Sequence, residues 1–377
     1  MLAAVIHLCA EIRSFERAHW VMKQVIGQAL SAKTIERLAH QVGQELQQES
    51  QVPTEKPEVV IPEVAVVSSD GGRIQTRAAD AGPGVHDAAW HETKNASFER
   101  MSGKVMAPSD PCEALPDTFR RVGHVAKIAE KSPFAGVFTE ADQLPLPAYQ
   151  GPKRILRTCI SSMAHSEEFG RQMRREAERR RFYEARRRVF IGDGLAWNWS
   201  IWRTHFPTFT PILDFIHAVQ YVYSAAEAWE SDGPTRWKRY LQLAEAIWQG
   251  RIDEVIEALR IELVNRGLTD EDDLPDGDPL QTLIDAKRYL TNNRTRMDYA
   301  QYRREGLPIT SSPMESLIKQ INHRVKGTEM FWLHPEGAEA ILQIRAASLC
   351  EDARLEEYLR RRPGHPFVRR PRPNLAT

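Results

Sequence analysis

The sequence contains few residues that could hold a soft metal ion or build a disulfide framework. Its four cysteines, Cys9, Cys112, Cys159 and Cys350, are far apart, and none belongs to a CxxC pair. Zinc ribbons and disulfide-rich folds need cysteines at close and regular spacing. The spacing therefore supports neither of them, and free thiols in the core are the expectation.

Long hydrophobic runs are also missing. No stretch of uncharged apolar residues approaches the ~18 that a membrane-spanning helix needs, so no membrane span is expected. The opening segment MLAAVIHLCAEIRSFERAHW has neither the basic start nor the small-residue cleavage site of a secretory signal. It favours a buried helix in a cytoplasmic protein.

An excess of charge of one sign is missing too, since 51 basic residues balance 51 acidic ones. The distribution is uneven, however. Residues 153–188 hold 12 basic and 5 acidic side chains, and residues 360–372 hold 6 arginines and no acid. Such segments can bind phosphates locally even in a neutral chain, although solvated helix faces have the same composition.

The N-terminal part reads as helices. Apolar residues recur at helical spacing from Phe15 to Leu30, and Ser31 can cap a second helix that contains IERLAHQVGQEL. Two helices joined by a short turn resemble a helix-turn-helix, although many helical hairpins share this pattern. Residues 49–62 are proline-rich and predict a linker.

The rest of the chain predicts a mixture of strands and helices. EVAVVSSDGGRIQTRAAD suggests a hairpin that turns at Asp70-Gly71-Gly72, and Trp90–Phe98 suggests a further strand. Residues 153–188 are expected to form a long basic helix before the short buried strand VFIG. A Trp-rich helix, a strand ending at Asp214 and a wholly helical region follow it, with a last helix in MESLIKQINHRVKG.

Two aspartates follow predicted strands: Asp70 after VAVVSS and Asp193 after VFIG. Strand ends place side chains in a crevice, and the flanking glycines let a substrate approach closely. An Asp-Gly pair is also a common turn, so each aspartate alone allows both interpretations.

The helix from Met314 carries a third carboxylate. Met314, Ile318, Ile321 and Val325 share one apolar stripe, and Glu315, Lys319, Asn322 and Lys326 form the stripe beside it. A carboxylate next to the core with lysines in line is typical of a metal ligand beside a phosphate track. An ordinary solvated face with a Glu–Lys pair is the alternative.

Three carboxylates brought together would repel one another unless a cation neutralised them. Hard oxygen ligands with no nearby cysteine or histidine select Mg²⁺ or Mn²⁺. Two such ions can activate an attacking oxygen and stabilise a leaving oxygen at a phosphodiester.

The three segments SSDGGRIQTR, FIGDGLAWNWSIWRTHFPTFTPILDFIHA and GLPITSSPMESLIKQINHRVKGTEMFW resemble the catalytic blocks of bacterial insertion-sequence transposases related to the Mutator group. The resemblance covers residues 20–350. It implies an RNase H-like α/β core, a mixed sheet flanked by helices, whose catalytic and metal-binding triad is Asp70, Asp193 and Glu315. It also implies an accessory role for Asp214 and His217, whose alternative is a strand-end aspartate and a buried histidine.

The resemblance divides the chain into a helical segment (1–52), the first part of the core (53–217), an all-α insertion (218–308), the glutamate helix (309–350) and a basic tail (351–377). Relatives carry a longer N-terminal part that recognises transposon ends, so a truncated copy is one expectation.

The implied activity is metal-dependent DNA cleavage and strand transfer, by a homo-oligomer bound to double-stranded transposon ends and target DNA near the bacterial nucleoid. The candidate DNA-binding residues are Lys319, Lys326, Arg174, Arg175, Arg179 and Arg180. Two alternatives remain: a nuclease that cuts without joining, and a non-catalytic DNA-binding relic of a transposon.

Overall fold

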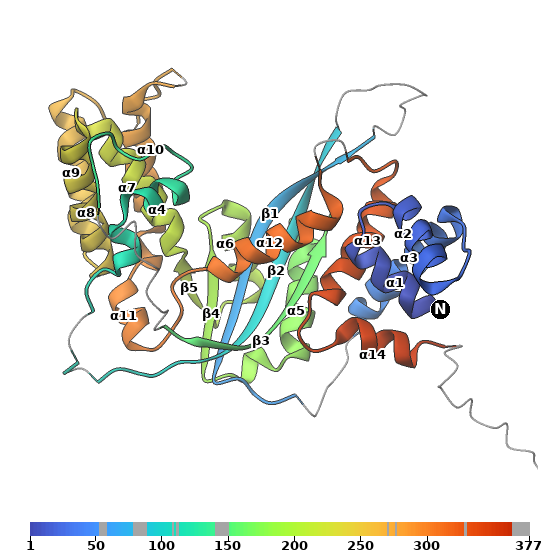
Figure 1. The fold of residues 1–377 in the computed structure, drawn as a ribbon. Helices are drawn as coiled ribbons and strands as arrows, with labels where there is room; N and C mark the ends of the chain where they lie inside the picture. Colours follow the sequence, from blue (N-terminus) through green and yellow to red (C-terminus); the bar gives the residue numbers. More distant parts are fainter. Residues whose placement is uncertain are drawn as a thin grey trace, which may run out of the picture.

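The computed structural model describes residues 1–52, 59–77, 89–107, 109–110, 113–139, 151–269, 271–275, 277–327 and 330–363, without the side chains of residues 312 and 313. Cys112 and part of the arginine-rich tail lie outside these residues. The fold is α/β, with one open five-stranded sheet flanked by helices (Figure 1). In the described residues no helix is long and apolar enough to cross a membrane.

The sheet is mixed and has the strand order β3-β2-β1-β4-β5. Its first three strands are antiparallel neighbours: β1 (Val64–Thr76), β2 (Ala89–Ser102) and β3 (Lys153–Ser162). On the other side of β1, the strands β4 (Arg187–Gly192) and β5 (Thr210–Leu213) run parallel to it. The chain therefore forms an antiparallel meander and then adds two parallel strands by crossover connections through helices.

The expected hairpin at Asp70-Gly71-Gly72 is wrong, because β1 continues through these residues without a turn. Gly71 and Gly72 are opposite Lys94 and Thr93 of β2, which provide the ladder partners. A Cβ atom on Gly72 would lie 2.7 Å from the Thr93 hydroxyl oxygen. This glycine therefore permits a close approach of two strands and does not mark a chain reversal.

The expected long helix over residues 153–188 is also wrong in its first part. Residues 153–162 form β3, which pairs with β2 and whose second half is mostly buried. A helix, α5 (Ser166–Arg179), begins only after it and is followed by a 3-10 turn, η4 (Phe182–Glu184). The basic composition does not distinguish the two structures, because sheet pairing with a distant segment decides the conformation of KRILRTCISS.

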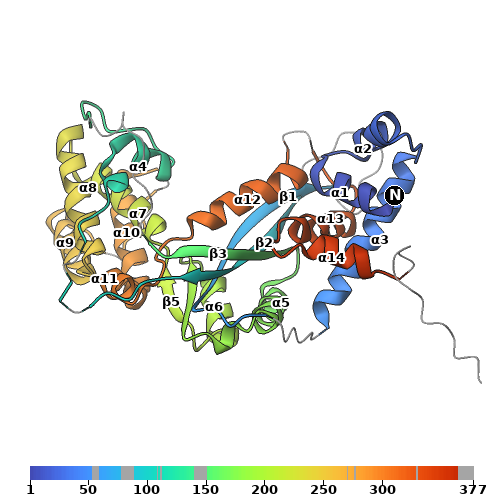
Figure 2. The ribbon, with the colours of Figure 1, turned by 60° about the horizontal axis from the view of Figure 1, so that its bottom comes forward.

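Different helices cover the two faces of the sheet. Figure 2 shows α12 (Ser312–Val325) and α13 (Pro335–Ser348) above the sheet, with α5 and α6 (Ala196–His205) below it. Neighbouring residues of β3 confirm the division, since the Thr158 hydroxyl donates to Glu176 of α5 whereas the Cys159 thiol donates to Ala346 of α13. Successive strand residues point to opposite faces.

Between β5 and α12 the described residues form only helices. These are α7 (Phe215–Trp229), α8 (Gly233–Trp248), α9 (Ile252–Asn265), α10 (Pro279–Asn293), η5 (Arg294–Arg296) and α11 (Tyr299–Arg304). The preceding η2 (Asp117–Arg120) and α4 (Val122–Ile128) pack with them. One continuous apolar core runs from Phe190 of β4 to Leu290 of α10, so this helical unit shares its core with the sheet.

The N-terminal helices pack on the opposite end of the molecule. They are α1 (Leu2–Glu11), α2 (Phe15–Val21) with its π-helical extension (Met22–Ile26), and α3 (Ala32–Gln51). Ser31 caps α3 as expected, since its hydroxyl accepts from the Thr34 amide. Gly43 lets α3 approach α13 closely, because a Cβ there would lie 2.3 Å from the Ala340 carbonyl oxygen. These helices share a second core with α12, α13 and α14 (Arg354–Arg361).

Candidate active site

Three aspartates lie in one row across the parallel half of the sheet. Ser68 of β1 is opposite Ile191 of β4, and two steps further along both strands come Asp70 and Asp193. Gly192 is opposite Leu213 of β5, and one step further come Asp193 and Asp214. Adjacent strands are about 4.8 Å apart, so the register places the backbones of the three aspartates side by side at the carboxyl end of β4 and β5.

The raised pKa of Asp70 is consistent with negative charge from Asp193 and Asp214 nearby. Burial is the largest cause that raises the pKa of its carboxyl group, from 3.8 to about 6, and the negative charge of Asp193 is the second. Asp214 contributes in the same direction, whereas the Gly71 amide and His217 oppose it. A carboxylate that is costly to ionise beside like charges is a suitable place for a cation.

Asp193 is held in place by residues that the sequence patterns did not single out. Its Oδ1 accepts hydrogen bonds from the Leu195 amide (2.9 Å) and from Nδ2 of Asn198 (2.7 Å). Asn198 is fully buried, and its Oδ1 accepts a 2.5 Å hydrogen bond from the hydroxyl of Ser69, the neighbour of Asp70. Asn198 thus joins the end of β4 to β1 and orients the Asp193 carboxylate.

The helical unit also contacts this site. The Tyr289 hydroxyl of α10 donates to the backbone carbonyl of Asp193 (2.6 Å), and its ring stacks on Tyr221 of α7 with 3.7 Å between centroids. Gly194 has φ +99°, and a Cβ there would lie 2.6 Å from the Tyr289 ring. The Asp-Gly pair therefore does form a tight bend, and the bend is pressed against the helical unit.

Asp214 connects the end of β5 to the beginning of α12. Its Oδ1 accepts from the Ile216 amide (2.9 Å), and its Oδ2 accepts from both the amide (3.2 Å) and the hydroxyl of Ser311. Its side chain is buried, and burial raises the pKa of this carboxyl group. Because both carboxylate oxygens accept hydrogen bonds from other residues of the protein, Asp214 holds the start of α12 against the end of β5. His217, in the first turn of α7, is half-buried and lowers the pKa values of Asp70 and Asp214 through its charge.

Glu315 lies on α12, one turn after Ser311, and its side chain is 51% exposed. Three members of the predicted apolar stripe are buried, since Met314, Ile321 and Val325 are at most 1% exposed. The fourth, Ile318, is only partly buried, and Leu317 is fully buried beside them. Glu315 is 4.0 Å from Nζ of Lys319. Among the described residues no group of three or more His, Cys, Asp or Glu side chains is arranged to hold a metal ion. The side-chain positions therefore bring neither Glu315 nor Asp214 together with Asp70 and Asp193 as a set of three ligands.

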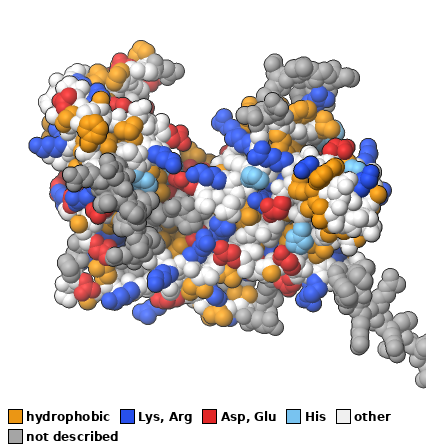
Figure 3. All heavy atoms as spheres, viewed as in Figure 1, with side chains coloured by type: hydrophobic (Ala, Val, Ile, Leu, Met, Phe, Trp, Pro, Cys, Tyr) orange, Lys and Arg blue, Asp and Glu red, His pale blue; other side chains and the backbone are white. Residues whose placement is uncertain are grey.

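Lys319 and Lys326 continue the exposed stripe from Glu315, and the Lys319 side chain is 80% exposed. Figure 3 shows lysine and arginine side chains over α12 and the upper parts of β1 and β2. It also shows the surface hollowed between this region and the helical unit, with acidic side chains beside the hollow. Arg73 is exposed on the same projecting part of β1.

The four candidate arginines of α5 and its C-terminus lie below the sheet, and all have intramolecular partners. Arg174 and Arg175 pair with Glu178 and Glu168. The Arg179 and Arg180 side chains are 11% and 7% exposed and pair with the buried Glu176.

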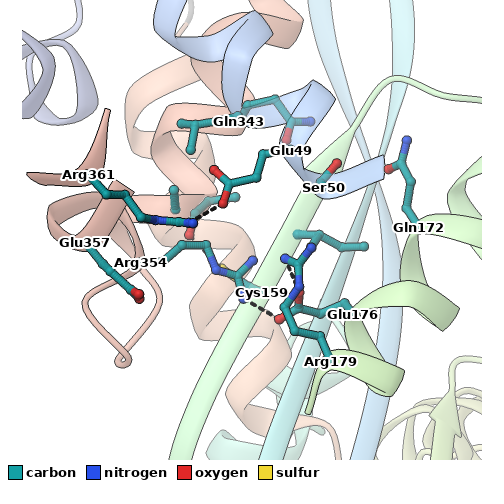
Figure 4. A pocket seen from close by; sticks show the side chains of 14 residues that line it. Glu49, Ser50, Cys159, Gln172, Glu176, Arg179, Gln343, Arg354, Glu357 and Arg361 are labelled. Carbon is teal, nitrogen blue, oxygen red and sulfur yellow. Dashed lines mark hydrogen bonds and ion pairs between the residues drawn. The ribbon is translucent and has the colours of Figure 1, made fainter. Parts of the chain in front are cut away.

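Arg354 of α14 completes this ion-pair group, because it also contacts Glu176. Figure 4 shows Glu176 between Arg179 and Arg354, next to a small cavity of about 60 Å³. The cations around Glu176 lower the pKa of its carboxyl group despite burial. Paired buried charges of this kind fix the position of α14 on α5.

Comparisons with models of known protein families and with curated proteins found no match.

Proposed function

We propose that this chain is a DDE-type DNA transposase, which cleaves DNA and joins the freed 3′ end to a target with the help of divalent metal ions. The row formed by Asp70, Asp193 and Asp214 at the carboxyl end of the parallel strands carries this proposal. The strand order, with an antiparallel meander followed by two parallel strands, supports an RNase H-like core.

The residues present fit Mg²⁺ or Mn²⁺. Asp70 and Asp193 provide hard oxygen ligands. The pKa of Asp70 is raised first by burial and second by the charge of Asp193, and a bound cation would relieve this repulsion. Glu315 would complete the ligand set by turning its exposed side chain towards the row, since Ser311 fixes the start of α12 to Asp214. When bound, the metal ions would activate the attacking oxygen and stabilise the leaving oxygen of the phosphodiester.

The other side chains of the site bind and orient. Asn198 and the Leu195 amide hold the Asp193 carboxylate through its Oδ1 atom. Asp214 clamps the glutamate helix to β5, so its proposed role is to position Glu315. Lys319 and Lys326 would contact phosphates of the DNA along α12.

Two measurements test this proposal. Mn²⁺ and Mg²⁺ should raise the melting temperature of the wild-type protein, and Asp193→Asn should abolish the increase, because a carboxylate ligand is replaced by a neutral amide. In parallel, donor DNA with 3′-hydroxyl ends should be joined to a plasmid target in the presence of Mg²⁺.

The outcomes separate the alternatives. Cleavage without joining would identify a nuclease on the same core. DNA binding with neither metal stabilisation nor cleavage would identify a non-catalytic relic, an alternative that the exposed position of Glu315 keeps open.

A further inference from the structure

The ribbon of β1 and β2 projects beyond the rest of the sheet. β1 pairs with β4 only as far as Ser68, and β2 pairs with β3 only from Lys94 onwards, so the outer parts of both strands pair only with each other in the sheet. Figure 1 shows this ribbon extending past the other strands. The carboxylate row lies at its base, and Gln75 and Trp90 are paired near its tip.

Two large aromatic side chains are exposed at this tip. Trp90 is 52% exposed and Phe331 is 48% exposed. They come from distant parts of the chain, and the backbone of Trp332, next to Phe331, pairs with β1. The Trp332 amide donates to the Gln75 carbonyl (2.9 Å), and the Trp332 carbonyl accepts from the Arg77 amide (2.8 Å). Single exposed aromatic side chains are common on proteins, so a binding role for this pair depends on the charged groups beside them.

Each aromatic ring has a cation beside it. Nζ of Lys326 is 5.8 Å from the Trp90 ring centroid, and the Arg77 guanidinium is 5.5 Å from the Phe331 ring centroid. Lys326 also ends the exposed stripe of α12 that begins at Glu315. Cations that follow a phosphate backbone and aromatic faces that stack on bases are the two components of single-strand DNA binding sites.

We infer that Trp90 and Phe331 form a stacking platform for the bases of a single-stranded DNA segment at the outer end of the ribbon that carries Asp70. The inference rests on the proposed function, because it names the form of DNA that this site takes. The positive charge of Lys326 and Arg77 matches the phosphates, and the exposed π faces accept any base without sequence preference.

The test uses the full chain without divalent metal, so that no cleavage occurs. Fluorescence anisotropy measures its affinity for an oligothymidine of about 20 nucleotides, longer than most single-strand sites. Trp90→Leu should weaken binding by about ten-fold because a stacking face is lost, and Trp90→Phe should retain most of the affinity. Trp20→Leu is the matched control, since Trp20 is 47% exposed and has the Arg17 guanidinium 4.2 Å from its ring.

An unchanged affinity for Trp90→Leu, or an equal loss for Trp20→Leu, overturns the platform. A wild-type protein that binds through Trp90 but never cleaves would refute the proposed function and not the platform.

Discussion

Replacing Asp70 by Asn should stabilise the metal-free protein at neutral pH. Burial and the charge of Asp193 raise the Asp70 pKa from 3.8 to about 6 in the folded state. Each pH unit between the folded and unfolded pKa corresponds to about 1.4 kcal/mol, so the ionised carboxylate costs the folded state on the order of 2–3 kcal/mol. Asn has nearly the same shape and carries no charge, so it avoids this cost.

The sign of the pH dependence follows from the raised pKa. Below the unfolded pKa the carboxyl group is protonated in both states, and wild type and variant should be equally stable. As the pH rises from about 4 to above 6, the wild type alone should lose stability, so the advantage of Asp70→Asn should grow and then remain constant.

Urea unfolding in the presence of a chelator, at several pH values across this window, measures the effect. Asp253→Asn is the control, because Asp253 is 63% exposed and pairs with Arg294 at the surface. That variant should change the free energy of unfolding by at most about 1 kcal/mol, with no gain as the pH rises. Equal stability of Asp70→Asn and wild type at every pH would refute the burial and repulsion on which the metal site rests. Added Mg²⁺ should stabilise the wild type and not Asp70→Asn.

Three further predictions follow from the same contacts. Glu315→Gln should change the free energy of unfolding by no more than about 0.5 kcal/mol, because Glu315 is half exposed, while DNA cleavage falls by orders of magnitude; unimpaired cleavage would remove Glu315 from the site. Asn198→Ala should cost about 1–3 kcal/mol in urea unfolding and weaken Mn²⁺ binding, since the Ser69 hydroxyl and Asp193 lose a buried partner; unchanged metal affinity would leave Asn198 only a structural role. Changing both Lys319 and Lys326 to Gln should lower the slope of log affinity against log salt by about two for duplex DNA, whereas the same change at the paired arginines 174 and 175 should not; the reverse result would place the DNA below the sheet.

Local patterns in the sequence determined several elements correctly. The stripes of α12 follow from helical periodicity alone, so the buried Met314 and Val325 and the exposed Glu315 and Lys319 could be assigned without the fold. The short apolar runs before Asp193 and Asp214 likewise predicted β4 and β5, because buried parallel strands are apolar on both faces. Each of these signals involves residues that are close in sequence.

Only the tertiary structure decided the features that depend on distant pairing. β1 continues through Gly71 and Gly72 because β2 provides its hydrogen-bond partners, and β3 replaces an expected helix for the same reason. Asn198 orients Asp193 across strands, which the sequence around either residue does not reveal. The register that aligns the aspartates, and the ion pairs that occupy the α5 arginines, arise when segments far apart in the chain meet, because strand ladders and buried charge pairs connect residues by position in space and not by spacing along the sequence.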